Sequence, residues 1–269
     1  MIDHDRVGKL QNTDALKIPS AARLYDYYLG GNFNLEADRA LAKQIYQVMP
    51  EMPYLARENR KFLQRAVRYC AELGISQYLD LGCGLPTVGP VHEIARKSRP
   101  DSKVLYVDNE PVAVEYSKMI LEGIQDVEIL HMDFRNVEEV LNSEPARRLI
   151  DFTEPVALMM VSVWHFIPDS DHPADVLKRY RAALAPDSHL ILSHVSGDTL
   201  DKVSGAADLY KNSQNPVTLR TRSEVTGMFA GFALVDPGVV FVPEWRPETP
   251  EDAEGAERCS FYGGVAQVP

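Results

Sequence analysis

Two glycines follow a short apolar run at a point where a chain can readily hold a ligand. Gly82 and Gly84 lie in the segment Tyr78–Thr87, between an expected strand, Gln77–Leu81, and an expected helix, Val88–Arg99. Glycine allows a sharp turn and lets a ligand approach the backbone where a Cβ atom would collide. The first turn of the expected helix after these glycines offers unpaired backbone N–H groups. The pattern predicts a ligand cradle or, without a ligand, a tight turn from strand to helix.

The residues around these glycines discriminate between classes of ligand. A third glycine at position 87 would favour a dinucleotide, whose pyrophosphate must approach the helix closely, but Thr87 stands there. Asp80 lies two residues before Gly82. A carboxylate at this place repels a pyrophosphate and attracts an ammonium group. S-adenosylmethionine carries an ammonium and a sulfonium group and no phosphate, so the sequence favours it as the cofactor.

Acidic residues also end the next two expected strands. Asp108 lies 24 residues beyond Gly84, close to the spacing at which a carboxylate accepts hydrogen bonds from ribose hydroxyls, although an Asp there can equally cap the next helix. Asp133 and Phe134 are candidates for an adenine amino group and ring, or they are a loop carboxylate and a core aromatic residue. Ligands of open parallel sheets bind at the carboxyl ends of the strands. Three carboxylates at successive strand ends therefore indicate a nucleoside site.

From about residue 77, short apolar runs alternate with amphipathic stretches. This alternation predicts an α/β fold with a mostly parallel sheet covered on both faces. The expected strands are Gln77–Leu81, Lys103–Val107, Val127–His131, Val156–Val163 and His189–His194, then Ala233–Val242 and Cys259–Val268 as an antiparallel pair; the expected helices between them are Val88–Arg99, Pro111–Gly123, Val137–Asn142, Asp171–Leu184 and Arg222–Phe229. The polar stretch Ser196–Val217 is an excursion, and Pro243–Glu257 is a solvated acidic connection.

The first seventy-odd residues are expected to be helical rather than to join the sheet. Helices are expected over Ser20–Gly30, Leu35–Met49 and Leu55–Leu73. The last of these places apolar residues at three-to-four spacing, which is typical of an amphipathic helix. We therefore expect a helical cap over residues 1–74 and a Rossmann-like core over residues 75–269.

Composition and charge exclude several classes of protein. The 269 residues are 45% hydrophobic and 25% charged, which is ordinary for a globular chain. A formal net charge of −11 makes nucleic acid and anionic membranes poor partners. The longest apolar stretch, Val156–Ile167, is too short to span a bilayer. The three cysteines have neither disulfide-framework nor metal-ligand spacing. We expect a cytoplasmic protein with a small-molecule substrate and no metal; the sequence leaves the oligomeric state open.

Several segments in order along the chain carry a family resemblance. They are Pro19–Asn32, Glu58–Arg68, Leu79–Thr87, His92 with Glu93, Tyr106–Pro111, His165–Asp169, Leu192–His194 and Trp245–Pro247. Through them the sequence resembles the class I S-adenosylmethionine-dependent methyltransferases, and more closely an actinobacterial methyltransferase family catalogued as a domain of unknown function. Two positions depart from the family pattern: Pro90 stands where Asn is more frequent, and Glu110 where Asp is more frequent. Pro90 alters a helix start, and neither change removes an expected ligand contact.

This resemblance implies a seven-stranded Rossmann-like sheet with an antiparallel last strand, and a helical N-terminal segment that caps the cofactor. It assigns cofactor contacts to residues at the strand ends, namely Asp80, Gly82, Gly84, Asp108, Asn109, Asp133, Phe134, Ser162 and Val163. It also suggests that Tyr25, Gly31 and Asn32 close over the site, where the tyrosine faces could attract a sulfonium. The segment around Tyr25 is otherwise an ordinary amphipathic helix that ends at a glycine. The resemblance does not supply a substrate.

Methyl transfer is an in-line displacement, so the enzyme must align an acceptor and exclude water. An acceptor that carries a proton also needs a base. His165 with Asp169 could form an oriented base after the fourth strand. Alternatively, His165 is a packed histidine and Asp169 caps the following helix. His194 ends the fifth strand and is more simply explained as structural.

Three hypotheses are therefore open. The favoured one is a methyltransferase that uses S-adenosylmethionine on a small or medium-sized organic acceptor. The second is a non-catalytic protein that binds S-adenosylmethionine or S-adenosylhomocysteine, because no base is certain. The third is an NAD(P)-dependent oxidoreductase, against which Thr87 and Asp80 argue.

Overall fold

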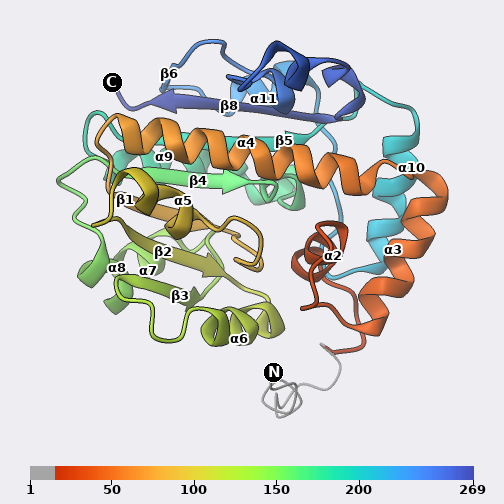
Figure 1. Cartoon of the computed structure of the whole chain (residues 1–269), viewed down its shortest axis with the longest axis horizontal. Helices are drawn as coiled ribbons and strands as arrows, with labels where there is room; N and C mark the ends of the chain where they lie inside the picture. Colours follow the sequence, from red (N-terminus) through yellow and green to blue (C-terminus); the bar gives the residue numbers. More distant parts are fainter. Residues whose placement is uncertain (1–15) are drawn as a thin grey trace.

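A central sheet of eight strands organises residues 16–269, the part of the chain that the computed structural model describes (Figure 1). The strands are β1 (Gln77–Leu81), β2 (Lys103–Asp108), β3 (Val127–His131), β4 (Ala157–Val161), β5 (His189–Val195), β6 (Ala233–Leu234), β7 (Val240–Phe241) and β8 (Phe261–Gln267). Their order is β3-β2-β1-β4-β5-β8-β6, and β7 also pairs with β8. Strands β1 to β5 are parallel, whereas β8 is antiparallel to β5. The expected α/β fold class is confirmed.

The sheet differs from the expectation at one edge. The expected strand Ala233–Val242 is two short strands, β6 and β7, both antiparallel to β8. Between them lie Pro237, which has no N–H to donate to the ladder, and Gly238, which has a φ of +82°. The sheet therefore counts eight strands where seven were expected, with β6 and β7 in the place of the sixth.

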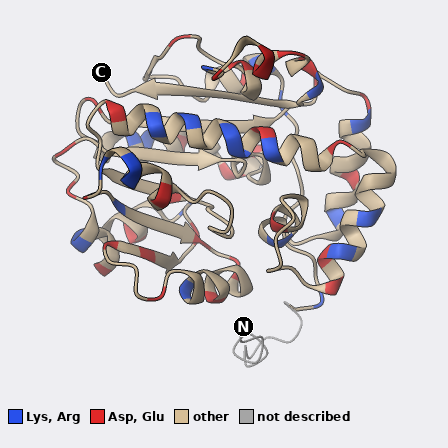
Figure 2. Cartoon of the chain, viewed as in Figure 1, with Lys and Arg blue, Asp and Glu red and all other residues tan. Residues whose placement is uncertain are grey.

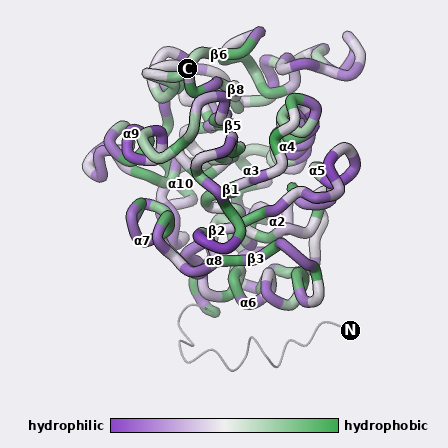
Figure 3. The backbone as a smooth tube through the Cα atoms, turned by 90° about the vertical axis from the view of Figure 1, so that its left-hand side faces the viewer, coloured by the Kyte–Doolittle hydropathy of each residue, from purple (hydrophilic) through white to green (hydrophobic). Residues whose placement is uncertain are grey.

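Helices cover both faces of the sheet, and the strands are apolar on both sides for that reason. Along β1, Tyr78 belongs to the apolar core under α4 (Met52–Glu72) and α5 (Val91–Ser98), whereas Leu79 belongs to the opposite core. That opposite core is covered by α7 (Val137–Asn142), α8 (Glu144–Leu149), α9 (Pro173–Ala183) and α11 (Arg222–Gly227). Figure 3 shows the strands as a column from β8 to β3, with α4 and α5 on one side, α7 and α9 on the other, and α6 (Pro111–Ile120) at the β3 edge. Short 3-10 turns complete the fold: Trp164–Phe166, Asp169–Asp171, Tyr210–Asn212, Val242–Glu244, Pro250–Ala253 and Ala256–Arg258.

A second group of helices stands beyond the carboxyl ends of the parallel strands (Figure 1). It consists of α2 (Ala21–Tyr28), α3 (Glu36–Val48) and α10 (Lys202–Leu209), and α10 packs against α3. The Ser20 side chain begins α2 by accepting the Arg23 N–H, and Gly30 follows its end with a φ of +81°. Helix α10 comes from the stretch expected to be only a polar excursion. The division into a cap of residues 1–74 and a core of residues 75–269 stays a prediction, and residues 1–15 lie outside the described part.

Charged side chains of both signs are spread over the surface (Figure 2). Lys and Arg recur along α4, and an acidic stretch lies in the connection between η4 (Val242–Glu244) and β8. In residues 16–269 we find no helix with the length and apolar character needed to cross a membrane.

Candidate active site

A cavity of about 310 Å³ lies between the carboxyl ends of β1 to β4 and the helices α2, α4 and α10. Its volume is at the lower end of the range for small-molecule sites. The predicted site residues that line it are Tyr25, Asp80, Gly82, Gly84, Asp108, Asn109, Asp133, Phe134, Ser162, Val163 and His165. The sheet brings them together because parallel strands end at one edge. Gly31, Asn32 and Asp169 do not line the cavity.

The glycine turn is built as its sequence predicts. Gly82 and Gly84 have φ values of +66° and +61°, in the left-handed region that favours glycine. A Cβ atom on Gly82 would lie 2.1 Å from Cγ2 of Val163. The Gly82 N–H donates to the carbonyl oxygen of Val107 at 2.8 Å, which fixes the turn to the end of β2. Gly82 therefore needs its hydrogen side chain for two reasons, the backbone conformation and the contact with Val163.

We expect Gly82→Ala to lower the free energy of unfolding by about 2–5 kcal/mol, because the strained backbone and the overpacked Cβ both add a cost. Urea unfolding monitored by circular dichroism measures this. Gly30→Ala is the matched control, since Gly30 also has a positive φ but no atom lies within 4 Å of its added Cβ. Its expected cost is only about 1–2 kcal/mol. Equal costs for the two variants would contradict the steric role of Val163.

Asp108 is the last residue of β2, and its carboxylate accepts two backbone hydrogen bonds. One oxygen accepts the Gly84 N–H at 2.8 Å, and the other accepts the Glu110 N–H at 2.9 Å. Burial raises the pKa of Asp108, against the effect of these N–H groups, which favour the ionised form. Its side chain also lines the cavity, beside the exposed Asn109. Asp108 is therefore both a support for the turn and a candidate acceptor for a ligand.

Two oppositely charged side chains in the cavity wall, Asp80 and Arg60, form no ion pair with each other within residues 16–269. Asp80 is 5% exposed, and its carboxylate accepts no hydrogen bond from another residue in the described part of the chain. Burial raises its pKa to about 7; Arg60 opposes this shift and Asp108 adds to it. Arg60 is also buried. Its guanidinium lies over the Tyr25 ring, 5.3 Å from the centroid, and its Nε atom has no hydrogen-bond partner among the described residues. A buried carboxylate and a buried guanidinium that form no ion pair with each other suit a zwitterionic ligand, which can bind both.

Asp133 and Phe134 follow β3 in the cavity wall. Asp133 receives two hydrogen bonds from Nε of Arg135, both at 3.0 Å, and Arg135 also pairs with Asp171. Burial alone would raise the pKa of Asp133, but the hydrogen bonds and charge of Arg135 hold it below its usual value. Phe134 stacks on Trp164 with ring centroids 5.9 Å apart. Asp133 is therefore a fixed carboxylate, and both of its oxygens already accept hydrogen bonds from Arg135.

His165 is 4% exposed and contacts Phe166, His194 and Phe261 with its ring. Its Nδ1 atom is buried and has no hydrogen-bond partner. Burial, with His194 and Arg220 nearby, holds its pKa well below the usual value, so the imidazole is neutral at pH 7.

Asp169 does not orient His165. Its carboxylate accepts a hydrogen bond from Arg220 at 2.6 Å, and the side chain is otherwise exposed. The same guanidinium donates to Nε2 of His194 at 2.9 Å and to the carbonyl oxygen of Ile167 at 2.9 Å. Because Nε2 of His194 accepts, its Nδ1 atom donates to the Val195 carbonyl oxygen at 2.6 Å. Arg220 thus takes the carboxylate that the sequence suggested for His165.

The model of a protein family described as S-adenosyl methyltransferase matches residues 9–269. The chain belongs to this S-adenosyl methyltransferase family. Two solved structures are similar over almost the whole methyltransferase. A candidate methyltransferase from Thermobifida fusca YX is 36% identical with a TM-score of 0.89, over 97% of this chain and 99% of the other. A DUF574 family protein from Streptomyces avermitilis MA-4680 is 33% identical with a TM-score of 0.89, over 94% of this chain and 99% of the other. No curated protein matches the methyltransferase.

These findings confirm the resemblance inferred from the sequence. The family, the Rossmann-like fold with its antiparallel last strand and the class of enzyme agree with the expectation, and both relatives come from actinobacteria. The chain is an S-adenosylmethionine-dependent methyltransferase by family, and its acceptor is not given by these relatives.

In this methyltransferase a chain of hydrogen bonds joins α2 to the sheet. The Tyr25 hydroxyl donates to the Ala56 carbonyl oxygen at 3.1 Å and accepts from Nδ2 of Asn59 at 2.9 Å. Oδ1 of Asn59 accepts from the Ser193 hydroxyl at 2.6 Å, and that hydroxyl oxygen accepts the Ser162 N–H at 3.0 Å. Tyr25 is therefore held over the cavity by contacts that reach the ends of β4 and β5.

Gly31 and Asn32 have other surroundings. A Cβ atom on Gly31 would lie 2.1 Å from Oδ1 of Asp26, so this glycine makes room for a buried carboxylate. Asp26 accepts hydrogen bonds from the Phe33 N–H, from Asn34 and from Thr87. Asn32 is exposed. The two residues shape the loop after α2 and do not form the cavity wall.

Sequence reasoning missed two functional candidates. Arg60 stands on the apolar face of α4, four residues after Ala56 and three before Leu63, and all three line the cavity. The sequence did carry a signal for Arg60, because a cation on the apolar face of a helix is rarely buried without a partner. Arg220 had no such signal, because its partners Asp169 and His194 are distant in the chain and meet it only in the fold.

Proposed function

We propose that this methyltransferase holds S-adenosylmethionine at the carboxyl ends of β1 to β3 and methylates a small organic acceptor in the same cavity. The observation that carries the proposal is the pair of buried, oppositely charged side chains Asp80 and Arg60: the Asp80 carboxylate accepts no hydrogen bond from residues 16–269, and Nε of Arg60 has no partner there. The amino acid part of the cofactor is a zwitterion, and its ammonium and carboxylate groups complement these two side chains.

The other lining residues complement the nucleoside. Asp108 would accept from the ribose hydroxyls, with Asn109 beside it, and Asp133 would accept from the adenine amino group, while Phe134 lies against the ring. Gly82 and Gly84 line the cavity next to Ser162 and Val163, and Val163 occupies the space that a Cβ atom on Gly82 would need. The bound cofactor supplies a methyl group already activated by a sulfonium. The cavity wall then has to align the acceptor and exclude water.

Calorimetric titration of the ligand-free protein tests the cofactor. S-adenosylhomocysteine is expected to bind with one site, whereas NAD is expected to show no binding at the same concentrations. The pyrophosphate of NAD would approach the buried carboxylates Asp80 and Asp108, which repel it. Tighter binding of NAD, or no binding of S-adenosylhomocysteine, would overturn the proposal.

We expect Asp108→Ala to weaken S-adenosylhomocysteine binding by about 1–3 kcal/mol, because charge-assisted hydrogen bonds are lost. Calorimetry measures the affinity. The Gly84 and Glu110 N–H groups also lose their acceptor in this variant, so Asp108→Asn is measured alongside it, since the amide oxygen can still accept one of them. Unchanged affinity in both variants would remove Asp108 from the ribose site.

One observation favours the second hypothesis, a protein that binds the cofactor without transferring its methyl group: no carboxylate orients His165, because Arg220 holds Asp169. Release of S-adenosylhomocysteine over a panel of acceptors separates a binder from an enzyme. A cytoplasmic location and the lack of a nucleic-acid partner stay predictions, supported by the net charge of −11.

A further inference from the structure

Charge is unevenly distributed around the cavity. The charged side chains that line it are Arg60, Asp80, Asp108, Glu110, Asp133 and Arg135. All but Arg60 lie at the ends of β1 and β2 or follow β2 or β3, and Arg60 lies near enough to Asp80 to oppose the rise that burial causes in its pKa. The remaining wall comes mainly from α2, α10, the apolar residues of α4, the turn after β4 and residues 214–219, and it contains no charged side chain among the described residues. One side of the cavity is thus polar and the other is neutral.

The neutral side is lined mostly by aromatic and aliphatic groups, together with the uncharged amide residues Gln214 and Asn215. The ring centroids of His165 and Phe166 lie 4.3 Å apart, and those of Phe166 and Tyr210 lie 6.1 Å apart. The hydroxyls of Tyr28 and Tyr210 hydrogen-bond to each other at 3.2 Å, so each already has a partner. Helix α10, which stands beside α3 in Figure 1, closes this side with apolar residues.

On this neutral side, His165 is a buried polar residue whose ring has no hydrogen-bond partner among the described residues. The side chain is more than nine-tenths buried, it lines the cavity, and its ring makes no hydrogen bond to any residue within 16–269. A buried polar group without a partner is costly, so its presence in a cavity wall points to a ligand that supplies the hydrogen bond. A hydroxyl group of a bound acceptor would satisfy it.

We propose that the acceptor is an uncharged, largely apolar aromatic compound, and that the methylated atom is a hydroxyl oxygen hydrogen-bonded to His165. The proposal rests on the proposed function, because the polar side must be occupied by the cofactor. A phosphate, carboxylate or ammonium group on the acceptor would lie buried on this side without an opposite charge, which is strongly unfavourable. Aromatic rings pack favourably against Phe166 and Tyr210.

The methyl transfer from the cofactor to the hydroxyl oxygen proceeds as follows with these groups. A lone pair of the hydroxyl oxygen forms the O–CH3 bond while the C–S bond breaks, and the electron pair of that bond stays on sulfur, which changes from a sulfonium to a neutral thioether. The hydroxyl proton passes to the neutral imidazole of His165. Burial, with the charges of His194 and Arg220 nearby, disfavours the imidazolium, so the proton then leaves to solvent.

Binding of matched probes to the protein saturated with S-adenosylhomocysteine tests the acceptor class. The probes are 2-naphthol and 6-hydroxy-2-naphthoate, which share the ring system and the hydroxyl and differ by one carboxylate. We expect 2-naphthol to bind at least about tenfold more tightly by calorimetry. Equal or tighter binding of the carboxylate overturns the proposal, and so does no binding of 2-naphthol up to its solubility limit. If S-adenosylhomocysteine itself does not bind, the proposed function fails instead.

The variant Val217→Lys adds a cation to a loop of the neutral side, where the fold is less constrained than in a helix. We expect it to shift the ratio of the two affinities by at least about tenfold toward 6-hydroxy-2-naphthoate. An unchanged ratio in a folded variant would show that the probes bind elsewhere and would overturn the proposal.

The role of His165 has its own test. His165→Gln keeps a hydrogen-bonding side chain but removes the base, so methyl transfer to 2-naphthol is expected to fall by at least about 100-fold. The affinity for S-adenosylhomocysteine should stay within twofold. His172→Gln is the matched control, since His172 is exposed and does not line the cavity. Full activity of His165→Gln, or no transfer to 2-naphthol by the unmodified enzyme, would overturn the assignment of the hydroxyl to His165.

Discussion

Asp80→Asn is expected to weaken S-adenosylhomocysteine binding by about 100-fold, since a charge-assisted hydrogen bond to the ammonium group becomes a neutral one in a buried place. The unmodified protein should also bind more tightly as the pH rises from 6 to 8, by up to about tenfold. Burial raises the pKa of Asp80 to about 7, so the carboxylate that the ammonium needs forms in this interval. The variant should show no such dependence. Calorimetry at pH 6, 7 and 8 measures both effects.

The same substitution should make the ligand-free protein more stable. The pKa of Asp80 is higher in the folded state than in the unfolded state, so its contribution to stability is present at low pH and is lost as the pH rises toward 7. Asp80→Asn removes this loss. We expect a gain in the free energy of unfolding of a few kcal/mol at pH 8, with an upper limit of about 4 kcal/mol, and a smaller gain at pH 5.

Urea unfolding at both pH values measures the stability, and Asp101→Asn is the matched control because Asp101 is largely exposed. That control should change neither affinity nor stability appreciably. Asp80 would have no role in binding if Asp80→Asn bound S-adenosylhomocysteine as the unmodified protein does. A variant less stable than the unmodified protein at pH 8 would show that Asp80 has a partner in the folded state.

The parts of the fold that local pattern determines could be predicted from the sequence. Strands buried on both faces are continuous apolar runs, so β1 to β5 were placed within a few residues of their bounds. Helix starts differed where proline intervened, as at α5, which begins at Val91 after Pro90. Helix α10 was missed because its sequence is mostly polar and small, and it is stabilised by contact with α3 rather than by a strong apolar stripe.

In the candidate site too, some features could be predicted from the sequence and others could not. Asp80, Asp108 and Asp133 could be predicted because a strand end is a local feature and the sheet edge collects all three. The pairing of His165 with Asp169 rested on closeness in the sequence. It could not be settled there, because the competing partner, Arg220, lies 51 residues from Asp169 and reaches it only through tertiary packing.

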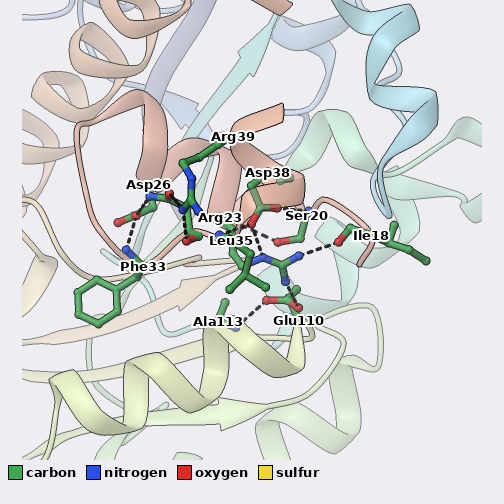
Figure 4. Close-up of polar contacts among 12 residues, drawn as sticks. Ile18, Ser20, Arg23, Asp26, Phe33, Leu35, Asp38, Arg39, Glu110 and Ala113 are labelled. Atoms are coloured by element: carbon green, nitrogen blue, oxygen red, sulfur yellow. Dashed lines mark hydrogen bonds and ion pairs between the residues drawn. The ribbon is translucent and has the colours of Figure 1, made fainter. Parts of the chain in front are cut away.

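The second large effect concerns Arg23, which is fully buried at the base of α2 (Figure 4). Its Nε donates to Asp38 at 2.8 Å and one terminal nitrogen donates to Glu110 at 2.6 Å, while the other donates to the Ile18 carbonyl oxygen at 2.7 Å. Glu110 also caps α6 by accepting the Ala113 N–H. This guanidinium therefore joins α2, α3 and the start of α6, next to the cavity that Glu110 lines.

We expect Arg23→Met to lower the free energy of unfolding by about 3–5 kcal/mol, because two carboxylates are left buried without their cation. The triple variant Arg23→Met, Asp38→Asn, Glu110→Gln removes both charges and should recover part of this loss. Urea unfolding compares the two, and Arg57→Met on the exposed side of α4 is the matched control. A triple variant no more stable than the single one would show that hydrogen bonds and packing, rather than uncompensated charge, determine the role of Arg23.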